Sequence, residues 1–196
     1  MSKKEKNKKY NETLQKYVDN KDFVKIFRTL CEKEENLSGF ILKMSEEFLL
    51  LQLDREFMFD GYAIIRQDDC DSIRCNKYDK TQKKIFKSEG LLDTSYGLDK
   101  NIDLTSWTTI IQDLKKYDYH IIVENINKDY LDFFIGPVTK ITKATVSIHN
   151  YDPSGILYSK SMNIKLGTIK TITFGDRYST VFRKYIKPQK STYKAS

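Results

Sequence analysis

The sequence predicts a mainly β fold with flanking helices, built from two tandem copies of one small domain. Three observations support this: a series of motifs occurs twice, short apolar segments rich in β-branched and aromatic residues follow one another, and amphipathic stretches flank each series. The copies lie about one hundred residues apart, too far for the unit of a solenoid. A length of 196 residues suits two small domains.

The repeat rests on matching segments at both ends and in the middle of each copy. Asp22-Phe23 and Asp118-Tyr119 open the copies, and Gly39 matches Gly136 in the apolar segment that follows. A glycine at the same place twice predicts a strong bend or a close backbone approach there. Later matches pair Asp60-Gly61-Tyr62 with Ser154-Gly155-Ile156, and Lys77-Tyr78 with Arg177-Tyr178.

In the first copy, residues 11–17 predict a short helix from the spacing of their apolar side chains. Segment 23–28 would suit a helix or a strand, and the β-branched matching segment 119–124 decides for a strand. Further strands are expected over 39–44, 48–53 and 62–66, with a short fifth one ending at Arg74. Residues 80–87 predict a closing helix that stops before Gly90.

In the second copy, Asp103 or Thr105 is expected to cap a leading helix with the apolar stripe Trp107, Ile110, Ile111 and Leu114. A closing helix is expected over 178–185, with Val181, Phe182 and Tyr185 on its inner side. The strands are expected over 119–124, 131–141, 144–150, 156–165 and 168–174, with a turn at 152–155. Five short strands behind a helix fit a small SH3-like barrel, because closure removes exposed edges.

These elements give a domain plan with a core. Lys-rich ends predict disordered tails over 1–10 and 188–196. Between them we expect a first small-barrel domain over 11–90, a linker over 91–102 and a second small-barrel domain over 103–187. The side chains expected to be mostly buried are Phe48, Leu50, Ile64, Trp107, Ile122, Val146 and Phe182.

Residues 37–74 carry motifs found in one family of small barrels. Gly39 sits in the second strand, Ser45-Glu46-Glu47-Phe48-Leu49-Leu50-Leu51 forms a turn and strand, and Ile65-Arg66-Gln67-Asp68 with Ile73 follows. This series resembles the Sm and Sm-like family, in which a turn Asp and an Asn line a pocket where bases stack. Leu49 or Leu50 stands where that Asn belongs, and Gln67 where a Gly belongs. The resemblance implies the fold and keeps only Arg66 of the RNA-contacting set.

Catalytic and metal-binding patterns are weak. His120 and His149 have no paired nucleophile or ligand spacing, and Asp68-Asp69-Cys70-Asp71 lacks the spacing of a calcium loop, so a solvated turn is expected. Cys75 near Lys77 is expected to be an unreactive thiol. We therefore expect no enzymatic activity, no cofactor and no metal. Three cysteines without CxxC spacing, and no secretory or membrane-spanning apolar run, predict a cytoplasmic protein that does not contact membranes.

Charge is distributed unevenly along the chain. The net charge is −7 over residues 31–72 and +8 over residues 160–196. Basic residues of the second copy alternate with Tyr158, Phe174, Tyr178, Tyr185 and Tyr193, which is typical of nucleic-acid surfaces, although aromatic residues in a core with solubilising lysines would give the same pattern. The expected contacts to RNA or single-stranded DNA are Arg66, Lys165, Lys170, Arg177, Arg183, Lys184 and Lys187, with Lys160 on the same face.

A second hypothesis fits the same asymmetry. The acidic first copy and the basic second copy would pair within the chain, or head to tail between chains, as a protein-interaction or self-association module. The sequence leaves both hypotheses open.

Overall fold

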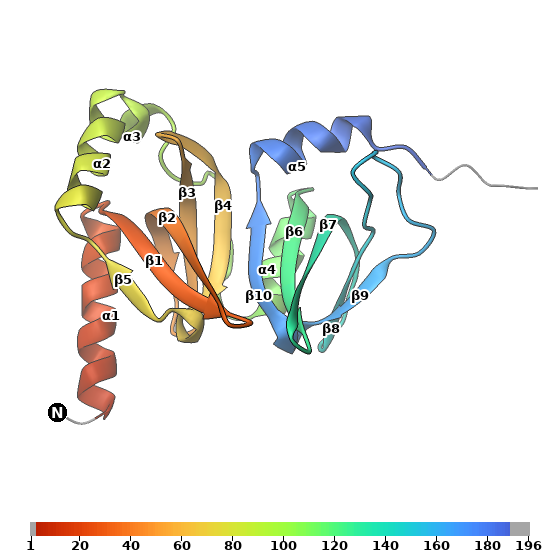
Figure 1. Cartoon of the computed structure of the whole chain (residues 1–196), viewed down its shortest axis with the longest axis horizontal. Helices are drawn as coiled ribbons and strands as arrows, with labels where there is room; N and C mark the ends of the chain where they lie inside the picture. Colours follow the sequence, from red (N-terminus) through yellow and green to blue (C-terminus); the bar gives the residue numbers. More distant parts are fainter. Residues whose placement is uncertain (1–2, 189–196) are drawn as a thin grey trace, which may run out of the picture.

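The computed structural model describes residues 3–188 and is mainly β, with one open antiparallel sheet of ten strands and helices packed around it (Figure 1). The strand order is β5-β1-β2-β3-β4-β10-β6-β7-β8-β9. The N-terminal set comprises β1 (Phe23–Leu30), β2 (Lys33–Met44), β3 (Phe48–Arg55), β4 (Met58–Arg66) and β5 (Ser72–Arg74). The C-terminal set comprises β6 (His120–Asn127), β7 (Tyr130–Ile141), β8 (Thr145–Ile148), β9 (Met162–Lys165) and β10 (Ile169–Phe174).

The two sets repeat one strand order. In each set the fifth strand lies beside the first, and the second, third and fourth follow outward. The sets join where β4 pairs with β10, from Ile65 opposite Thr171 to Tyr62 opposite Phe174. The sheet is therefore continuous through this junction, and β5 and β9 lie at its two ends.

The turn between the second and third strands is built alike in both sets. Ser45 N donates to Phe48 O at 2.9 Å, and Thr142 N donates to Thr145 O at 2.8 Å. The Ser45 hydroxyl accepts from Phe48 N, as the Thr142 hydroxyl accepts from Thr145 N. A short polar side chain that accepts from nearby backbone N–H groups favours such turns.

Gly39 and Gly136 occupy equivalent, tightly packed positions in β2 and β7, as predicted. Their φ angles are 153° and 154°. A Cβ atom would lie 2.0 Å from the Gln52 carbonyl oxygen at Gly39, and 2.2 Å from that of His149 at Gly136. Only glycine lets the neighbouring backbone approach so closely at this place in each long strand.

Helices pack against both strand sets (Figure 1). They are α1 (Lys3–Asp19), α2 (Lys77–Ser88), α3 (Leu91–Thr94), α4 (Trp107–Lys116) and α5 (Arg177–Phe182), with 3-10 turns η1 (Gln67–Asp69), η2 (Leu166–Thr168) and η3 (Arg183–Tyr185). Helices α1 and α2 pack on the N-terminal set, and α4 and α5 pack on the C-terminal set. The whole predicted stripe of α4 is buried. Its cap is Ser106, whose side chain accepts from Thr109 N, rather than Asp103 or Thr105.

The largest core spans the junction between the sets. Trp107 of α4 packs its ring 4.7 Å from the ring of Phe48 in β3, and Ile64 joins Ile172 and Phe174 in the same cluster. Two smaller cores lie in the N-terminal set. One forms beneath α1 around Leu14 and Leu49, and an aromatic one packs against α2 around Phe40 and Phe86.

Several expectations about boundaries are wrong. Helix α1 begins at Lys3 rather than Asn11, so the tail expected over 1–10 is helical where it is described. Residues 156–161 lie outside β9, and α3 lies within the expected linker. Gly61 belongs to β4 whereas Gly155 ends a turn, so these two glycines are not equivalent. The C-terminal tail lies outside the described residues from 189 onward.

The predicted core is correct at five of seven positions. Ile122 is half-buried because the inward phase of β6 falls on Ile121 and Val123, and Phe182 at the end of α5 is half-buried as well. On the closing helix, Val181 and Tyr185 are exposed rather than inward. Within residues 3–188, no helix combines the length and apolar character needed to cross a bilayer.

Candidate functional site

Three of the predicted nucleic-acid contacts are held in ion pairs. Arg66 pairs with Glu47, and its guanidinium also lies over the rings of Phe48 and Trp107. Lys170 pairs with Asp69, and Arg183 pairs with Asp118. These cations are partly neutralised before any external anion arrives, which weakens their contribution to polyanion binding.

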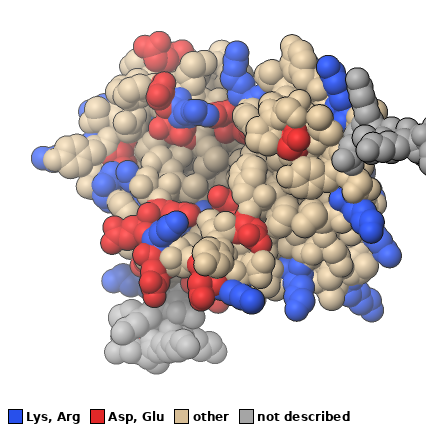
Figure 2. Space-filling model, turned by 45° about the vertical axis from the view of Figure 1, so that its right-hand side comes forward, with Lys and Arg blue, Asp and Glu red and all other residues tan. Residues whose placement is uncertain are grey.

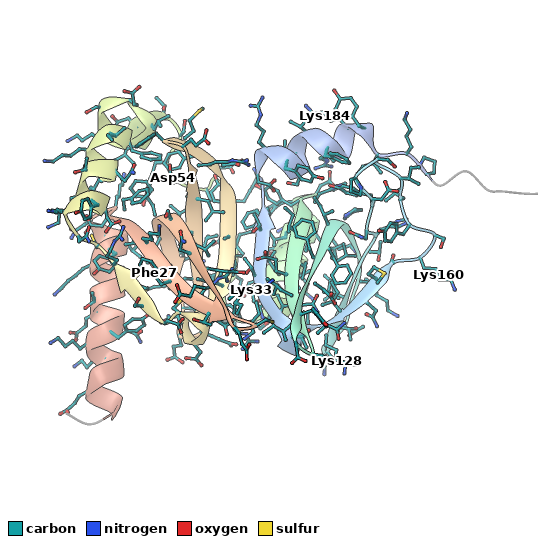
Figure 3. The ribbon with its side chains drawn as sticks, in the orientation of Figure 1. Phe27, Lys33, Asp54, Lys128, Lys160 and Lys184 are labelled. Carbon is teal, nitrogen blue, oxygen red and sulfur yellow. The ribbon has the colours of Figure 1, made fainter. Side chains whose placement is uncertain are left out.

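The other predicted contacts are exposed but do not form one surface. Lys165, Lys184 and Lys187 have no ion-pair partner among the described residues, and the Arg177 side chain likewise has none. Lys184 lies on the helical layer at one end of the C-terminal set, and Lys128, which shares a cavity with Lys165, lies at the opposite end (Figure 3). Figure 2 shows acidic side chains gathered on the N-terminal set and basic ones scattered around the C-terminal set.

The aromatic residues of that pattern divide between core and surface. Phe174 is fully buried and stacks on Tyr62 at 5.3 Å between ring centroids. Tyr158, Tyr178 and Tyr185 are exposed, and Tyr193 lies outside the described residues. Tyr178 and Tyr185 lie in α5 and η3, beside the exposed cations Arg177 and Lys184. The β6–β7 hairpin at the opposite end of the set likewise exposes Lys128, Tyr130 and Phe133.

Charged contacts cross the junction between the two sets. Asp69 of η1 binds Lys170 of β10, and Asp60 of β4 accepts from the backbone N–H of Arg177 at 2.7 Å. Arg28 of β1 reaches Glu124 of β6, with 3.6 Å between the charged atoms. An acidic residue of the N-terminal set thus meets a basic residue of the C-terminal set at Asp69 and Lys170, whereas the polarity is reversed at Arg28 and Glu124.

Arg28 is the most deeply buried cation of the described chain. Its side chain is 1% exposed and donates to Glu35, the residue directly opposite on β2, at 3.0 Å. Its Nε and one terminal nitrogen have no hydrogen-bond partner among the described residues. Burial of a charged group with unsatisfied donors is unfavourable, so the two carboxylates at its other nitrogen are needed to hold it.

The C-terminal set has a cavity of about 450 Å³ where the N-terminal set has Arg28. Its polar lining includes Asn125, Asn127, Lys128, Asp132 and Lys165. Asn125 occupies the position of Arg28, since each lies opposite a carboxylate residue of the second strand, Asp132 or Glu35. The shorter side chain leaves space, and its Oδ1 is buried without a partner in the described part of the chain.

In each of two further cavities, a charged side chain already has partners within the chain. One of about 480 Å³ lies between the β3–β4 hairpin and α5, where Asp60 accepts from Arg55 and from the Arg177 N–H. The other, of about 340 Å³, lies under residues 96–102, where the Lys43 ammonium donates to Asn101 and to the Ile102 carbonyl. Among the described residues that line these two cavities, none has a buried polar side-chain atom without a partner.

Several of the titratable side chains singled out in the sequence are partly buried or bind neighbouring side chains of the fold. Burial and the nearby Arg183 lower the pKa of His120 to about 4. Burial raises the pKa of Cys70 to about 12, and all three cysteines are free. Within residues 3–188, no group of three His, Cys, Asp or Glu side chains converges as a metal site. Asp69 and Asp71 instead bind Lys170 and the Thr29 hydroxyl.

Both ends of the sheet present an unpaired strand edge in the described chain. β5 pairs only with β1, and β9 pairs only with β8. An open edge carries backbone donors and acceptors that can pair with another strand. Since β5 and β10 are equivalent, as are β9 and β4, each free edge corresponds to one that is paired at the junction.

Comparison with models of known protein families, with curated proteins and with solved structures gave no match.

Sequence reasoning did not single out Arg28, Asn125, Lys128 or Asp132. A signal was available, because Ile121, Val123 and Asn125 alternate on one face of β6. A polar residue in the inward phase of an otherwise apolar strand indicates a buried polar group that needs a partner.

Proposed function

We propose that the chain is a non-catalytic binding module made of two tandem Sm-like small barrels, and that it associates head to tail with further copies of itself. The repeated strand order, the matching turns at Ser45 and Thr142 and the matching positive φ of Gly39 and Gly136 support the duplication. The observation that carries self-association is the β4–β10 pairing, because its two equivalents, β9 and β5, are free at opposite ends of the sheet.

The equivalence of β5 with β10, and of β9 with β4, fixes the expected register between chains. Thr171 lies opposite Ile65 at the junction. Ser72 corresponds to Thr171 in its pairing with the first strand, and Ile164 corresponds to Ile65 in its pairing with the third strand. Ser72 of one chain would therefore lie opposite Ile164 of the next, with Asp71 next to it facing Lys165.

Charge favours this arrangement. Asp71 and Lys165 are both exposed in the single chain, and neither is held in an ion pair among the described residues. Opposite charges at facing positions of an antiparallel pair stabilise it, whereas like charges destabilise it. A head-to-tail contact of this kind gives a closed ring or an open filament, depending on its rotation angle.

The test is a charge swap followed by mass measurement. Light scattering should give a mass above the 23.1 kDa of one chain. Lys165→Glu alone and Asp71→Lys alone should each lower the mass, because like charges then face each other. The double variant should restore it. Lys184→Glu is the matched control and should leave the mass unchanged, because Lys184 lies on η3, away from both edges.

A second candidate function is binding of RNA or single-stranded DNA. It is favoured by the free cations Arg177, Lys184 and Lys187 near the exposed rings of Tyr178 and Tyr185. Cations neutralise phosphates and aromatic faces stack on unpaired bases. Removing one cation that binds a phosphate should reduce the slope of log affinity on log salt by about 0.7 for a single strand.

Fluorescence anisotropy with a labelled oligonucleotide tests this candidate. Replacing Lys184 and Lys187 by Gln should weaken binding and flatten its salt dependence. Replacing Lys140 and Lys143 by Gln is the control, because these exposed lysines flank the β7–β8 turn. Absence of binding near 150 mM salt, roughly the physiological ionic strength, would leave self-association as the sole proposal.

A further inference from the structure

The cavity of the C-terminal set has the composition of a ligand site. It measures about 450 Å³ and opens between the β6–β7 hairpin and the β9–η2 segment. Ligand pockets are usually of this order and combine apolar walls with a few polar groups. Here Phe134, Met162 and Ile164 supply apolar walls, and amide, carboxylate and ammonium groups supply the polar ones.

One polar group of this cavity lacks a partner within the described protein. Asn125 is 7% exposed, and its Oδ1 is buried without a hydrogen bond. Directly across the strand pair, Asp132 accepts from the Asn127 side chain at 3.0 Å through one carboxylate oxygen. A buried acceptor without a partner is unfavourable. A ligand with N–H donors would therefore bind more tightly here, both because it forms hydrogen bonds and because it satisfies the Asn125 oxygen.

The N-terminal set shows what chemistry fits this place. There Arg28 stands where Asn125 stands, and its planar guanidinium donates to Glu35, the equivalent of Asp132. The C-terminal set keeps the carboxylate but lacks the planar donor. A planar ligand with adjacent N–H groups would supply what the arginine supplies in the other set.

We propose that this cavity binds the guanine of a nucleotide, either free or within a single strand. The N1–H and N2–H groups of guanine share the donor arrangement of a guanidinium and face Asp132 and the Asn125 oxygen. Lys128 lies at the same cavity and attracts the phosphate, as does Lys165 in a chain whose β9 edge is unoccupied. An arginine side chain has the same donors, but its positive charge is repelled by the two lysines. This site goes beyond head-to-tail association and does not rest on it.

The experiment is a calorimetric titration of the full chain with GMP, AMP, UMP, L-arginine and a guanine-containing oligonucleotide. GMP should bind saturably and at least about tenfold more tightly than AMP or UMP, since a site built to accept from a group rejects analogues that lack it. Asp132→Asn should weaken GMP binding by about tenfold, because the charged acceptor is removed. Lys128→Gln should weaken it by about threefold to tenfold, because one of the two cations at the phosphate is removed.

Two further variants complete the test, one that fills the cavity and one that serves as a control. Asn125→Arg copies the N-terminal set and should abolish binding by filling the cavity; circular dichroism must show that it is folded, and Asp132→Asn decides if it is not. Lys84→Gln is the control and should leave GMP affinity unchanged, because Lys84 is exposed on α2, which packs against β1 of the N-terminal set (Figure 1).

Every outcome bears on the proposal. Binding of GMP, or of a guanine-containing oligonucleotide when the free nucleotide does not bind, supports it and tells the two sources apart. Equal affinity for GMP, AMP and UMP overturns the guanine assignment, and preference for L-arginine replaces the nucleotide by a guanidinium ligand. No saturable binding of any probe, or GMP binding that ignores Asp132→Asn, overturns the site. Light scattering on the same samples reports self-association separately.

Discussion

At the scale of single residues, two glycines allow close contact between neighbouring strands. At both Gly39 and Gly136 the positive φ and the adjacent carbonyl oxygen exclude a Cβ atom. Gly39→Ala and Gly136→Ala should each lower the free energy of unfolding by about 3 kcal/mol or more, since neighbouring backbone must shift. Chemical denaturation monitored by circular dichroism measures this.

Gly167 provides the matched control for those substitutions. A Cβ atom there meets nothing within 4 Å. Gly167→Ala should leave stability within about 0.5 kcal/mol of the parent chain, or raise it slightly. Equal losses of stability at all three glycines would contradict the role of Gly39 and Gly136 in the close approach of the strands.

His120 makes stability depend on pH. Its pKa is lowered from the ordinary 6.5 to about 4, chiefly by burial. As the pH falls, the unfolded chain takes up this proton first, so the histidine's contribution is complete above pH 6.5 and is lost between 6.5 and 4. The loss should be on the order of 1–2 kcal/mol, allowing for partial solvation of the ring.

Thermal unfolding across that pH range measures the effect. His120→Phe should flatten the dependence between pH 6.5 and 4, whereas His149→Gln, which removes the other histidine, should retain it. A parent chain whose stability is constant over this interval would show that His120 is not held neutral by its surroundings.

Residue-level features were predictable where a backbone or packing rule applies. The repeat located both glycines because no other residue serves there, and helical spacing found the buried stripe of α4. The partners of Arg28 and the cavity beside Asn125 could not be predicted, because they depend on which residue lies opposite across a strand pair.

At the scale of elements, helix α4 depends on its capping residue. The Ser106 side chain accepts from Thr109 N, and Thr109 in turn accepts from Ser106 N. Ser106→Ala should cost about 1 kcal/mol of stability, as expected for loss of an N-cap. Thr105→Ala is the comparison, and urea denaturation measures both variants. A greater loss of stability for Thr105→Ala than for Ser106→Ala would show that Thr105, as predicted from the sequence, is the cap.

Element types were predicted better than element ends. All ten strands occur where strands were expected, because alternation and β-branched residues mark them. The ends differ because pairing with β1 extends β2 back to Lys33, and because the Asp152 turn and its hydrogen bonds replace the first part of the expected ninth strand.

At the scale of the whole molecule, the two strand sets share a core. Phe48, Leu50 and Ile64 of the N-terminal set pack in one cluster with Trp107 and Phe174 of the C-terminal part. Neither set can open without exposing the apolar surface of the other. Differential scanning calorimetry should therefore show one transition whose calorimetric and van't Hoff enthalpies agree. Two separate transitions would indicate independently folding halves.

The charge asymmetry was predictable, but its arrangement in space was not. Acidic and basic stretches are visible in the sequence, and the fold brings part of each together at the junction through Asp69 and Lys170. The basic residues of the second half divide between opposite ends of the strand set, since α5 and the β6–β7 hairpin leave the sheet in opposite directions (Figure 1).

The central proposal is that β5 and β9 pair between chains as β10 and β4 pair within one. Light scattering of the charge-swap series tests it most directly. We expect a mass above that of one chain, a lower mass for Lys165→Glu and for Asp71→Lys, and restoration in the double variant. A monomeric parent chain at every accessible concentration, or a double variant that stays as small as the single ones, would contradict it.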